Sequence, residues 1–269
     1  MRYRRGSGTP RYMDFGTLAD LSGMVITASL LIGFLAGIVK GAIGFALPLI
    51  MISGLSSIMD PRLALAGLIV PVVVTNLWQI FRDGIAPVLA AVRDVWRYVV
   101  IVCLSILVFA QLVPMIPQRV FYFLLGVPVV MLAVVQLAGV RLTIPPHRRG
   151  PAEVIAAAIS GMLGGLAGTW GPTTVLYLLA IETPKAKQMV VQGVIYGSGA
   201  FMLLFAHLYS GILTPATTTF SAVLLLPALL GMWIGFRLQD RMNQDSFRRA
   251  TLVMLVIGGL NLLRKGLFG

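Results

Sequence analysis

The sequence predicts an all-α polytopic membrane protein with two repeated modules, each combining a glycine-broken or re-entrant helix with long transmembrane helices. Hydrophobic residues make up 58% of the 269 residues and charged residues 11%, whereas soluble domains carry about 25% charged residues. About twenty apolar residues in a helix span the hydrocarbon layer of a bilayer. Runs without Asp, Glu, Lys or Arg cover 63–81, 98–118, 120–140, 154–181, 188–236 and 250–263. The alternation typical of an outer-membrane barrel is absent, so these runs predict helices.

The two modules are indicated by a pattern that occurs twice. The stretches "GAIG" (41–44) and "GTWG" (168–171) each interrupt an apolar run after glycine-spaced residues. A short apolar run and a charged turn follow each of them, "MDPR" (59–62) or "IETPKAK" (181–187). Three longer apolar segments complete each module: roughly 63–82, 97–116 and 119–140, and roughly 188–209, 216–236 and 247–264.

The chain is therefore expected to divide into four parts. These are a basic N-terminal tail (1–20), a first transmembrane repeat (21–140), an inter-repeat loop (141–153) and a second transmembrane repeat (154–269). The first two apolar runs of each repeat are too short for both to be full spans. This favours a helix, a glycine-rich break and a second short helix. Broken helices at matching positions of two halves are the best sequence indication of a transporter's binding site.

Loop charges bear on the orientation, because cytoplasmic loops are enriched in Lys and Arg. If the glycine-broken element re-enters without crossing, three full spans remain per half and the second copy is inverted. Every strongly basic loop after residue 80 then faces the cytoplasm, but the basic tail lies outside, contrary to the rule. If the first element crosses, the tail returns to the cytoplasm. Both arrangements stay open, with six to eight crossings.

The glycine breaks predict an anion-binding site. Lys40 has no charged residue within nineteen positions on either side. A helix start presents unpaired N–H groups and a partial positive charge, and in hydrocarbon those donors need an acceptor. Lys40 would supply the full positive charge, and Pro172 suits the first turn of a new helix. The predicted substrate-binding residues are Lys40, Gly41, Gly44, Asn76, Gly168, Thr169, Trp170, Gly171, Thr173 and Gln192.

Structural alternatives stand beside these assignments. Glycines spaced as Gly33 and Gly37 are typical of helix packing, and Lys40 would snorkel to the interface if its run lay near a boundary. Asn76 and Gln192 follow the two breaks on the next long segments, where they reach the same cavity or form interhelical hydrogen bonds. The apolar runs offer neither a Ser–His–Asp set nor clustered metal ligands. The sequence therefore predicts no catalytic residues, no metal and no cofactor.

With these features the chain resembles the TauE/SafE family of sulfite and organosulfur anion permeases. The resemblance rests on "GFLAGIVKGAIGFALPLIM", its echo "GMLGGLAGTWGPTTVLYLLA", their order and the turn "DPRLALAG". It implies carriage of small sulfur-containing or carboxylate anions across a bacterial inner membrane by a multi-pass protein. Two features depart from the family's pattern: three glycines after the break are missing, and Lys40 stands where the family tends to have small or apolar residues.

Together these observations predict a secondary transporter of a small anion, such as sulfite or a sulfonate, working by alternating access. No G-x-x-x-x-G-K-[ST] run is present, so the expected driving force is a gradient of protons, ions or the substrate rather than ATP. The net charge of +12 is spread between the apolar runs, which does not favour a nucleic-acid partner. The alternatives are a non-transporting membrane scaffold, a carrier of another small solute and an intramembrane enzyme. The oligomeric state stays open.

Overall fold

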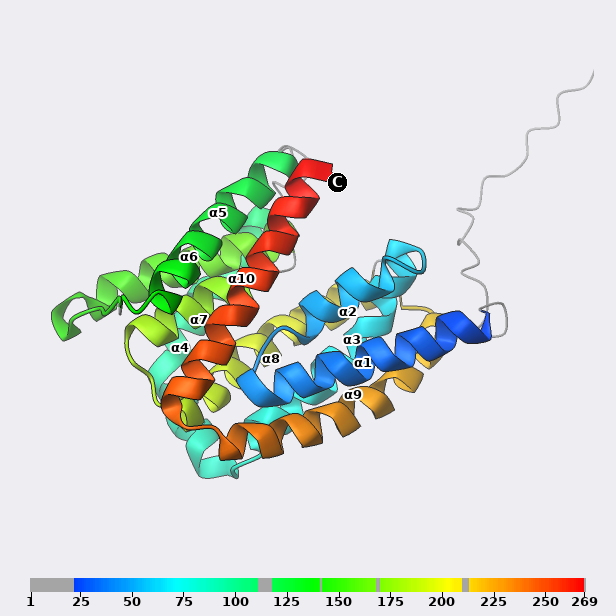
Figure 1. Ribbon diagram of the computed structural model, residues 1–269, viewed down its shortest axis with the longest axis horizontal. Coiled ribbons are helices and arrows are strands. Elements are labelled where there is room, and N and C mark those ends of the chain that lie inside the picture. The colour runs from blue at the N-terminus through cyan, green and yellow to red at the C-terminus, as the bar shows by residue number, and fades with distance from the viewer. Residues whose placement is uncertain (1–21, 111–117, 141, 168–169, 210–212, 269) are drawn as a thin grey trace, which may run out of the picture.

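The structure, a computed structural model, describes residues 22–110, 118–140, 142–167, 170–209 and 213–268, and over these ranges it contains helices and no strand (Figure 1). The elements are α1 (Gly23–Ile43), α2 (Leu47–Leu55), α3 (Pro61–Phe81), α4 (Ile85–Ala110), α5 (Gln118–Leu137), the 3₁₀ turn η3 (Pro146–Arg148), α6 (Arg149–Ala167), α7 (Gly171–Ala180), α8 (Lys185–Tyr209), α9 (Pro215–Arg241) and α10 (Gln244–Phe268).

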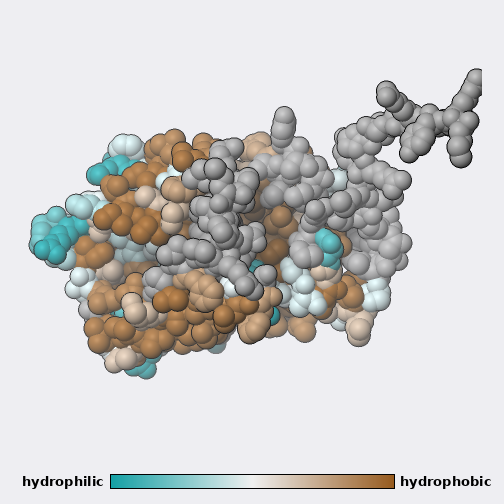
Figure 2. All heavy atoms as spheres, turned by 90° about the horizontal axis from the view of Figure 1, so that it is seen from above, coloured by the Kyte–Doolittle hydropathy of each residue, from teal (hydrophilic) through white to brown (hydrophobic). Residues whose placement is uncertain are grey.

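The outer surface is that of a membrane protein. Within the described ranges, five helices are long and apolar enough to span a bilayer: α1, α3, α8, α9 and α10. Large hydrophobic side chains such as Leu31 on α1, Met131 on α5 and Leu226 on α9 face outward. Figure 2 shows that hydrophobic residues cover most of the described surface on one face, with hydrophilic residues gathered at its left end. The prediction of an all-α polytopic membrane protein is confirmed.

The first glycine-rich stretch forms a hairpin of α1 and α2. Gly44 caps α1 with φ = 84°, the left-handed conformation that glycine adopts without strain, and its N–H donates to the carbonyl of Lys40 at 2.7 Å. Ala46 also has a positive φ of 74°, and Pro48 lies in the first turn of α2. The short helix then returns along α1, since Gly54 packs against Ile32. The break therefore lies at residues 44–46, at the end of the predicted stretch 41–44.

A second hairpin is formed by α6 and α7. The helix α7 starts at Gly171 with Pro172 in its first turn, as the sequence predicted. The open end of this hairpin is held where Arg149, at the start of α6, donates to the carbonyl of Ile181 at 3.4 Å. Nearby, the N–H of Ile144 donates to the carbonyl of Ala180 at 2.8 Å. The chain thus enters and leaves this hairpin at the same end of the molecule.

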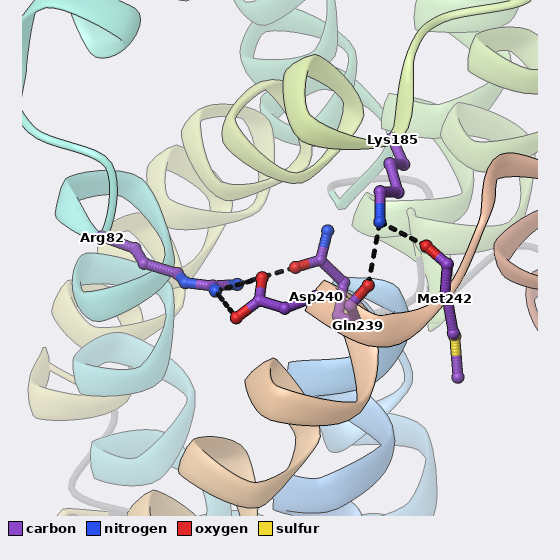
Figure 3. A network of polar contacts seen from close by, with 5 residues as sticks. All are labelled: Arg82, Lys185, Gln239, Asp240 and Met242. Atoms are coloured by element: carbon purple, nitrogen blue, oxygen red, sulfur yellow. Dashed lines mark hydrogen bonds and ion pairs between the residues drawn. The ribbon is translucent and has the colours of Figure 1, made fainter.

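Basic residues tie several helix ends together at one end of the molecule, here called the basic end (Figure 3). Arg82, just after α3, pairs with Asp240 near the end of α9 at 2.5 Å and donates to the side chain of Gln239 at 2.7 Å. The ammonium of Lys185, at the start of α8, donates to the backbone carbonyls of Gln239, at 3.1 Å, and Met242. A cation at these carbonyls also offsets the partial negative charge at the C-terminus of α9.

The two hairpins enter the molecule from opposite ends. Figure 1 shows α1 (dark blue) beside α9 (orange). The two helices run in the same direction, because their contacts advance together: Gly33 lies by Leu224, Gly37 by Ala228 and Gly41 by Met232. Since α9 finishes at the basic end, α1 starts at the other end. The α6/α7 hairpin starts at the basic end, because Arg248 at the start of α10 donates to the carbonyl of Leu179 near the end of α7 at 3.4 Å.

Close packing between helices explains why glycines line α1. Helix α1 packs on α9, α6 on α4, α5 on α10, and α3 on α8. A Cβ atom at Gly37 would lie 2.1 Å from the carbonyl oxygen of Ala228, and one at Gly231 would lie 2.0 Å from that of Phe34. The packing alternative therefore holds for Gly37, as expected of small residues at membrane helix contacts.

A proline inside α3 receives compensation from α9. Pro71 has no N–H, so the carbonyl of Gly67 one turn earlier loses its helical donor. The hydroxyl of Ser221 donates to this carbonyl at 2.9 Å and accepts the N–H of Val70 at 3.0 Å. A break in the helical hydrogen bonds thereby becomes a cross-link between two helices.

The segment predicted to begin near residue 97 was placed too late. Helix α4 begins at Ile85, so residues 85–96 are helical. Exposed Arg93, Asp94 and Arg97 lie on the helix itself. The charge-free run marks only the apolar part of the helix, which continues beyond it with exposed charged side chains. The start of α6 at Arg149 shows the same effect inside the predicted loop 141–153.

Candidate functional site

The tips of the two hairpins meet at a cavity of about 60 Å³. Holding one water takes about 10–15 Å³ in this measure, so the cavity has room for several waters or one anion of a few heavy atoms. Most of its wall is apolar. Its lining is Lys40, Phe45, Ala46, Pro48, Leu49, Val72, Asn76, Trp170, Gly171, Pro172, Tyr196, Gly258 and Leu262.

Lys40 brings a cationic group to this cavity from the last turn of α1. Its side chain is 2% exposed, and the Nζ atom donates to Oδ1 of Asn76 on α3 at 2.7 Å. Although Lys40 lies in the last turn of α1, this hydrogen bond holds its amine within the protein interior, so the snorkelling alternative does not describe it. An ammonium has three N–H donors, and one of them is directed to Asn76.

Two helix N-termini border the same cavity. Ala46, Pro48 and Leu49 come from the start of α2, and Gly171 and Pro172 from the start of α7. Neither N-terminus has a side-chain hydrogen bond as a cap. Unpaired N–H groups and the helix dipole favour negative charge at such positions. The cavity thus combines a lysine amine with the positive ends of two helices.

Tyr196 of α8 fixes the second tip at the cavity wall. Its hydroxyl donates to the carbonyl of Gly171 at 3.1 Å. A Cβ atom at Gly171 would have ordinary contacts with Phe45, at 3.7 Å, and with Tyr196, at 3.8 Å. Trp170 is buried and lies against Gly199 of α8, where a Cβ would be 2.7 Å from the indole ring. Phe45 of the first break thus lies near the start of α7 at the second break.

A buried hydroxyl cluster orients the start of α7. Thr174 Oγ1 donates to the carbonyl of Trp170 at 3.0 Å and accepts the hydroxyl of Tyr98 from α4 at 3.1 Å. Ser160 Oγ of α6 lies 2.9 Å from the Tyr98 hydroxyl and 3.1 Å from Thr174 Oγ1. Three helices thus meet in one set of mutually satisfied hydroxyls, which stiffens the second tip.

Two predicted residues, Gln192 and Gly44, contact each other at the first break and do not line the cavity. With its amide oriented so that donors meet acceptors, Gln192 donates to the carbonyls of Ile43, at 3.1 Å, and Gly44, at 3.3 Å, and accepts from Gln188 at 3.0 Å. A Cβ atom at Gly44 would lie 2.0 Å from this glutamine and 3.1 Å from Nε2 of Gln79. Gly44 is therefore required for packing of two buried amides against the turn.

The remaining predicted residues separate into three groups. Lys40, Asn76, Trp170 and Gly171 line the cavity. Gly41 contacts α9, since a Cβ there would lie 2.3 Å from the carbonyl of Met232, and half-buried Thr173 does not contribute to the lining. Gly168 and Thr169 lie outside the described residues.

Several lining residues were not predicted from the sequence. Tyr196 follows Gln192 by four residues, one turn of helix, so a search for polar groups along that face of the predicted helix would have found it. Phe45, Val72 and the two residues of α10, Gly258 and Leu262, carry no local signal. They line the cavity because distant segments of the chain pack there.

A larger cavity of about 560 Å³ lies near the basic end, between α4, α6, α7 and α8. Asp94, Glu153, Glu182, Arg149 and Lys187 contribute its charges, and Lys187 pairs with Asp94 at 2.6 Å. With three carboxylates against two cations, this wall does not favour an anion. Among the described residues, no group of three or more His, Cys, Asp or Glu side chains is placed to hold a metal ion.

Comparison with known protein families gives one result that covers most of the chain. The family model described as "Sulfite exporter TauE/SafE" matches residues 29–262. Comparison with curated proteins and with solved structures gave no match. The matched range contains the α6/α7 hairpin, the α1/α2 hairpin from residue 29 onward, and all residues that line the cavity at their tips.

Proposed function

Since the chain belongs to the TauE/SafE sulfite exporter family, we propose that it is a secondary transporter that moves a small anion across the inner membrane by alternating access. The observation that carries this proposal is the meeting of both hairpin tips and Lys40 at one cavity. A scaffold without transport activity would have these breaks filled by packed side chains. The cavity supports the transporter instead.

The anion binds between Lys40 and the starts of α2 and α7. Lys40 supplies one full charge, and Asn76 orients its amine. The largely apolar wall, with Phe45, Trp170 and Leu262, suits an anion with one charged group and a small apolar body. Sulfonates and short carboxylates have this form, whereas the singly protonated form of sulfite shares the single charge but has no apolar body.

The two halves act as inverted copies that rock about this cavity. In support, the hairpins enter from opposite ends, and α1 packs on α9 as α6 packs on α4. The basic end faces the cytoplasm in this proposal, because Lys and Arg are enriched in cytoplasmic loops. Helices α3, α4, α5, α8, α9 and α10 then cross the membrane. The two hairpins re-enter from opposite sides, so α1 does not cross in this proposal although it is long and apolar enough to do so. Inverted repeats about a midplane site occur in other transporters.

Transport by purified protein in liposomes tests the proposal. Uptake of sulfite, methanesulfonate, sulfate and acetate is measured with and without a pH gradient, for the wild type and for Lys40→Met. A charge–charge contact at about 4 Å is worth about 4 kcal/mol at an effective dielectric constant near 20, or about a thousandfold in affinity. We therefore expect Lys40→Met to raise the apparent KM by at least about tenfold and by up to about a thousandfold.

Lys187→Met is the matched control, because it removes an equal charge from a half-exposed lysine outside the site cavity. It is expected to transport like the wild type. Equal uptake by the Lys40→Met and wild-type proteins would remove Lys40 from the site. Failure of the wild type to move any anion of the panel would refute the proposed function itself.

A further inference from the structure

Lys40 is a buried amine that has no acidic partner among the residues the structure describes. Its side chain is 2% exposed, and its hydrogen-bond acceptor is the neutral amide of Asn76 at 2.7 Å. The residues that line the cavity include no Asp, Glu, Arg or His. Buried lysines in proteins are ordinarily paired with a carboxylate. The described lining of the cavity thus supplies no counter-ion for a protonated Lys40.

The elements around the cavity bring few other titratable groups to it. Helix α8 contributes the hydroxyl of Tyr196, which is bonded to the carbonyl of Gly171. Tyr177 of α7 stacks on Tyr98, with ring centroids 5.6 Å apart, and lines the other cavity. The part of α9 that packs on α1, residues 224–236, has no titratable side chain, nor has α2. The charged residues of α10 lie toward its two ends: Asp245, Arg248 and Arg249 at the start, and Arg264 and Lys265 at the finish.

An ammonium ion in such surroundings is stable only when an opposite charge lies beside it. Removing an unpaired ammonium from water costs several kcal/mol even after the protein relaxes, and a hydrogen bond to an amide offsets only part of that. A bound anion offsets much more, because opposite charges attract strongly where water is excluded. Binding of a proton to Lys40 and binding of the anion therefore favour each other, and this linkage is reciprocal.

We infer that the proton is the coupling ion and that Lys40 carries it. On the loading side, the amine takes a proton from water as the anion binds, which gives an ammonium–anion pair. On the other side the anion leaves, the N–H bond breaks with its electron pair staying on nitrogen, and the proton returns to water. One proton thus accompanies each monovalent anion, and the loaded site crosses as a neutral pair. This inference rests on the proposed function and adds its energy source.

Proton movement is measured directly in proteoliposomes that contain a pH-sensitive dye. Methanesulfonate is the probe, because it is the anion of a strong acid and carries no titrating proton of its own, unlike sulfite. The wild type is expected to move one proton per methanesulfonate, in the same direction. A pH gradient should drive accumulation, and a membrane potential set by potassium and valinomycin should change the rate less than twofold.

Lys40→Arg provides the second test, since a guanidinium stays charged at every pH used. It is expected to lower methanesulfonate exchange and to move no protons in the exchange that remains. Lys187→Met should keep the wild-type ratio of one proton per anion. Wild-type uptake of methanesulfonate without proton movement would overturn the inference, as would proton-coupled accumulation by the Lys40→Arg protein. Absence of uptake of every anion in the panel would count against the proposed function instead.

Discussion

Replacement of Gly37 by alanine adds one methyl group at a close approach between α1 and α9. The new Cβ would lie 2.1 Å from the carbonyl oxygen of Ala228, which is 1.3 Å inside the 3.4 Å at which ordinary van der Waals contact begins. The neighbour is helix backbone and cannot rotate away, so the two helices must separate. Overpacking of this kind destabilises the fold by about 1–3 kcal/mol. This cost is larger than the gain in helix stability from replacing glycine by alanine, which is about 0.5–1 kcal/mol.

The same helix provides the matched control. At Gly33 a Cβ would lie 3.5 Å from the carbonyl oxygen of Leu224 and 3.7 Å from Pro227, both ordinary contacts. Gly33→Ala should therefore leave the protein as stable as the wild type or slightly more so. At about 2–4 °C for each kcal/mol, Gly37→Ala should lower the apparent Tm by several degrees.

Thermal unfolding in detergent, followed by tryptophan fluorescence, measures this difference, and methanesulfonate uptake measures its effect on the site. Lys40 lies three residues after Gly37 in α1, so a displaced helix also moves its amine relative to Asn76. The uptake rate should fall for Gly37→Ala and not for Gly33→Ala. Equal Tm values for the two variants would refute the argument that backbone contact at Gly37 sets the distance between α1 and α9.

Two further predictions concern buried hydroxyls. Thr174→Val removes the hydroxyl that donates to the Trp170 carbonyl and accepts from Tyr98. Leaving these partners unsatisfied costs about 1–3 kcal/mol, so the stability of the protein and the uptake rate should both fall. Thr174→Ser should restore both, and a Val variant as active as the Ser variant would contradict this. Ser221→Ala removes the donor to the Gly67 carbonyl and should lower the apparent Tm by an amount that corresponds to about 1–2 kcal/mol; an unchanged Tm in the same fluorescence assay would show that Pro71 needs no compensation from α9.

Part of the site was predictable because its signals are local in the sequence. A lysine in an apolar run is costly wherever the run is buried, so Lys40 could be singled out without coordinates. Trp170 and Gly171 belong to the second glycine-rich stretch, and Pro172 fits only the first turn of a helix. For Asn76 the sequence left two roles open, lining the cavity or forming an interhelical hydrogen bond. The structure shows that it both lines the cavity and forms an interhelical hydrogen bond, with Lys40.

Other expectations about the site failed to distinguish two uses of the same residue type. Gly41 and Gly44 are required for packing, against α9 and against two buried glutamines respectively. A glycine that allows close approach of another helix and one that allows close approach of a ligand look the same in the sequence, because both roles require only the absence of a side chain. Which of the two applies depends on what lies opposite, and at Gly41 that is the backbone of Met232, 191 residues later in the chain.

By itself, the sequence determined that this is a helical membrane protein with two broken helices and one isolated lysine in its apolar part. These properties follow from hydropathy, chain length and backbone stereochemistry, which act over a few turns of helix. Only the tertiary structure decided that the two breaks meet, that Lys40 points to Asn76 with no carboxylate in the described cavity lining, and that α10 contributes to the cavity wall. These facts depend on how helices pack across long separations in the chain, where close fit between surfaces, rather than local pattern, selects the neighbour.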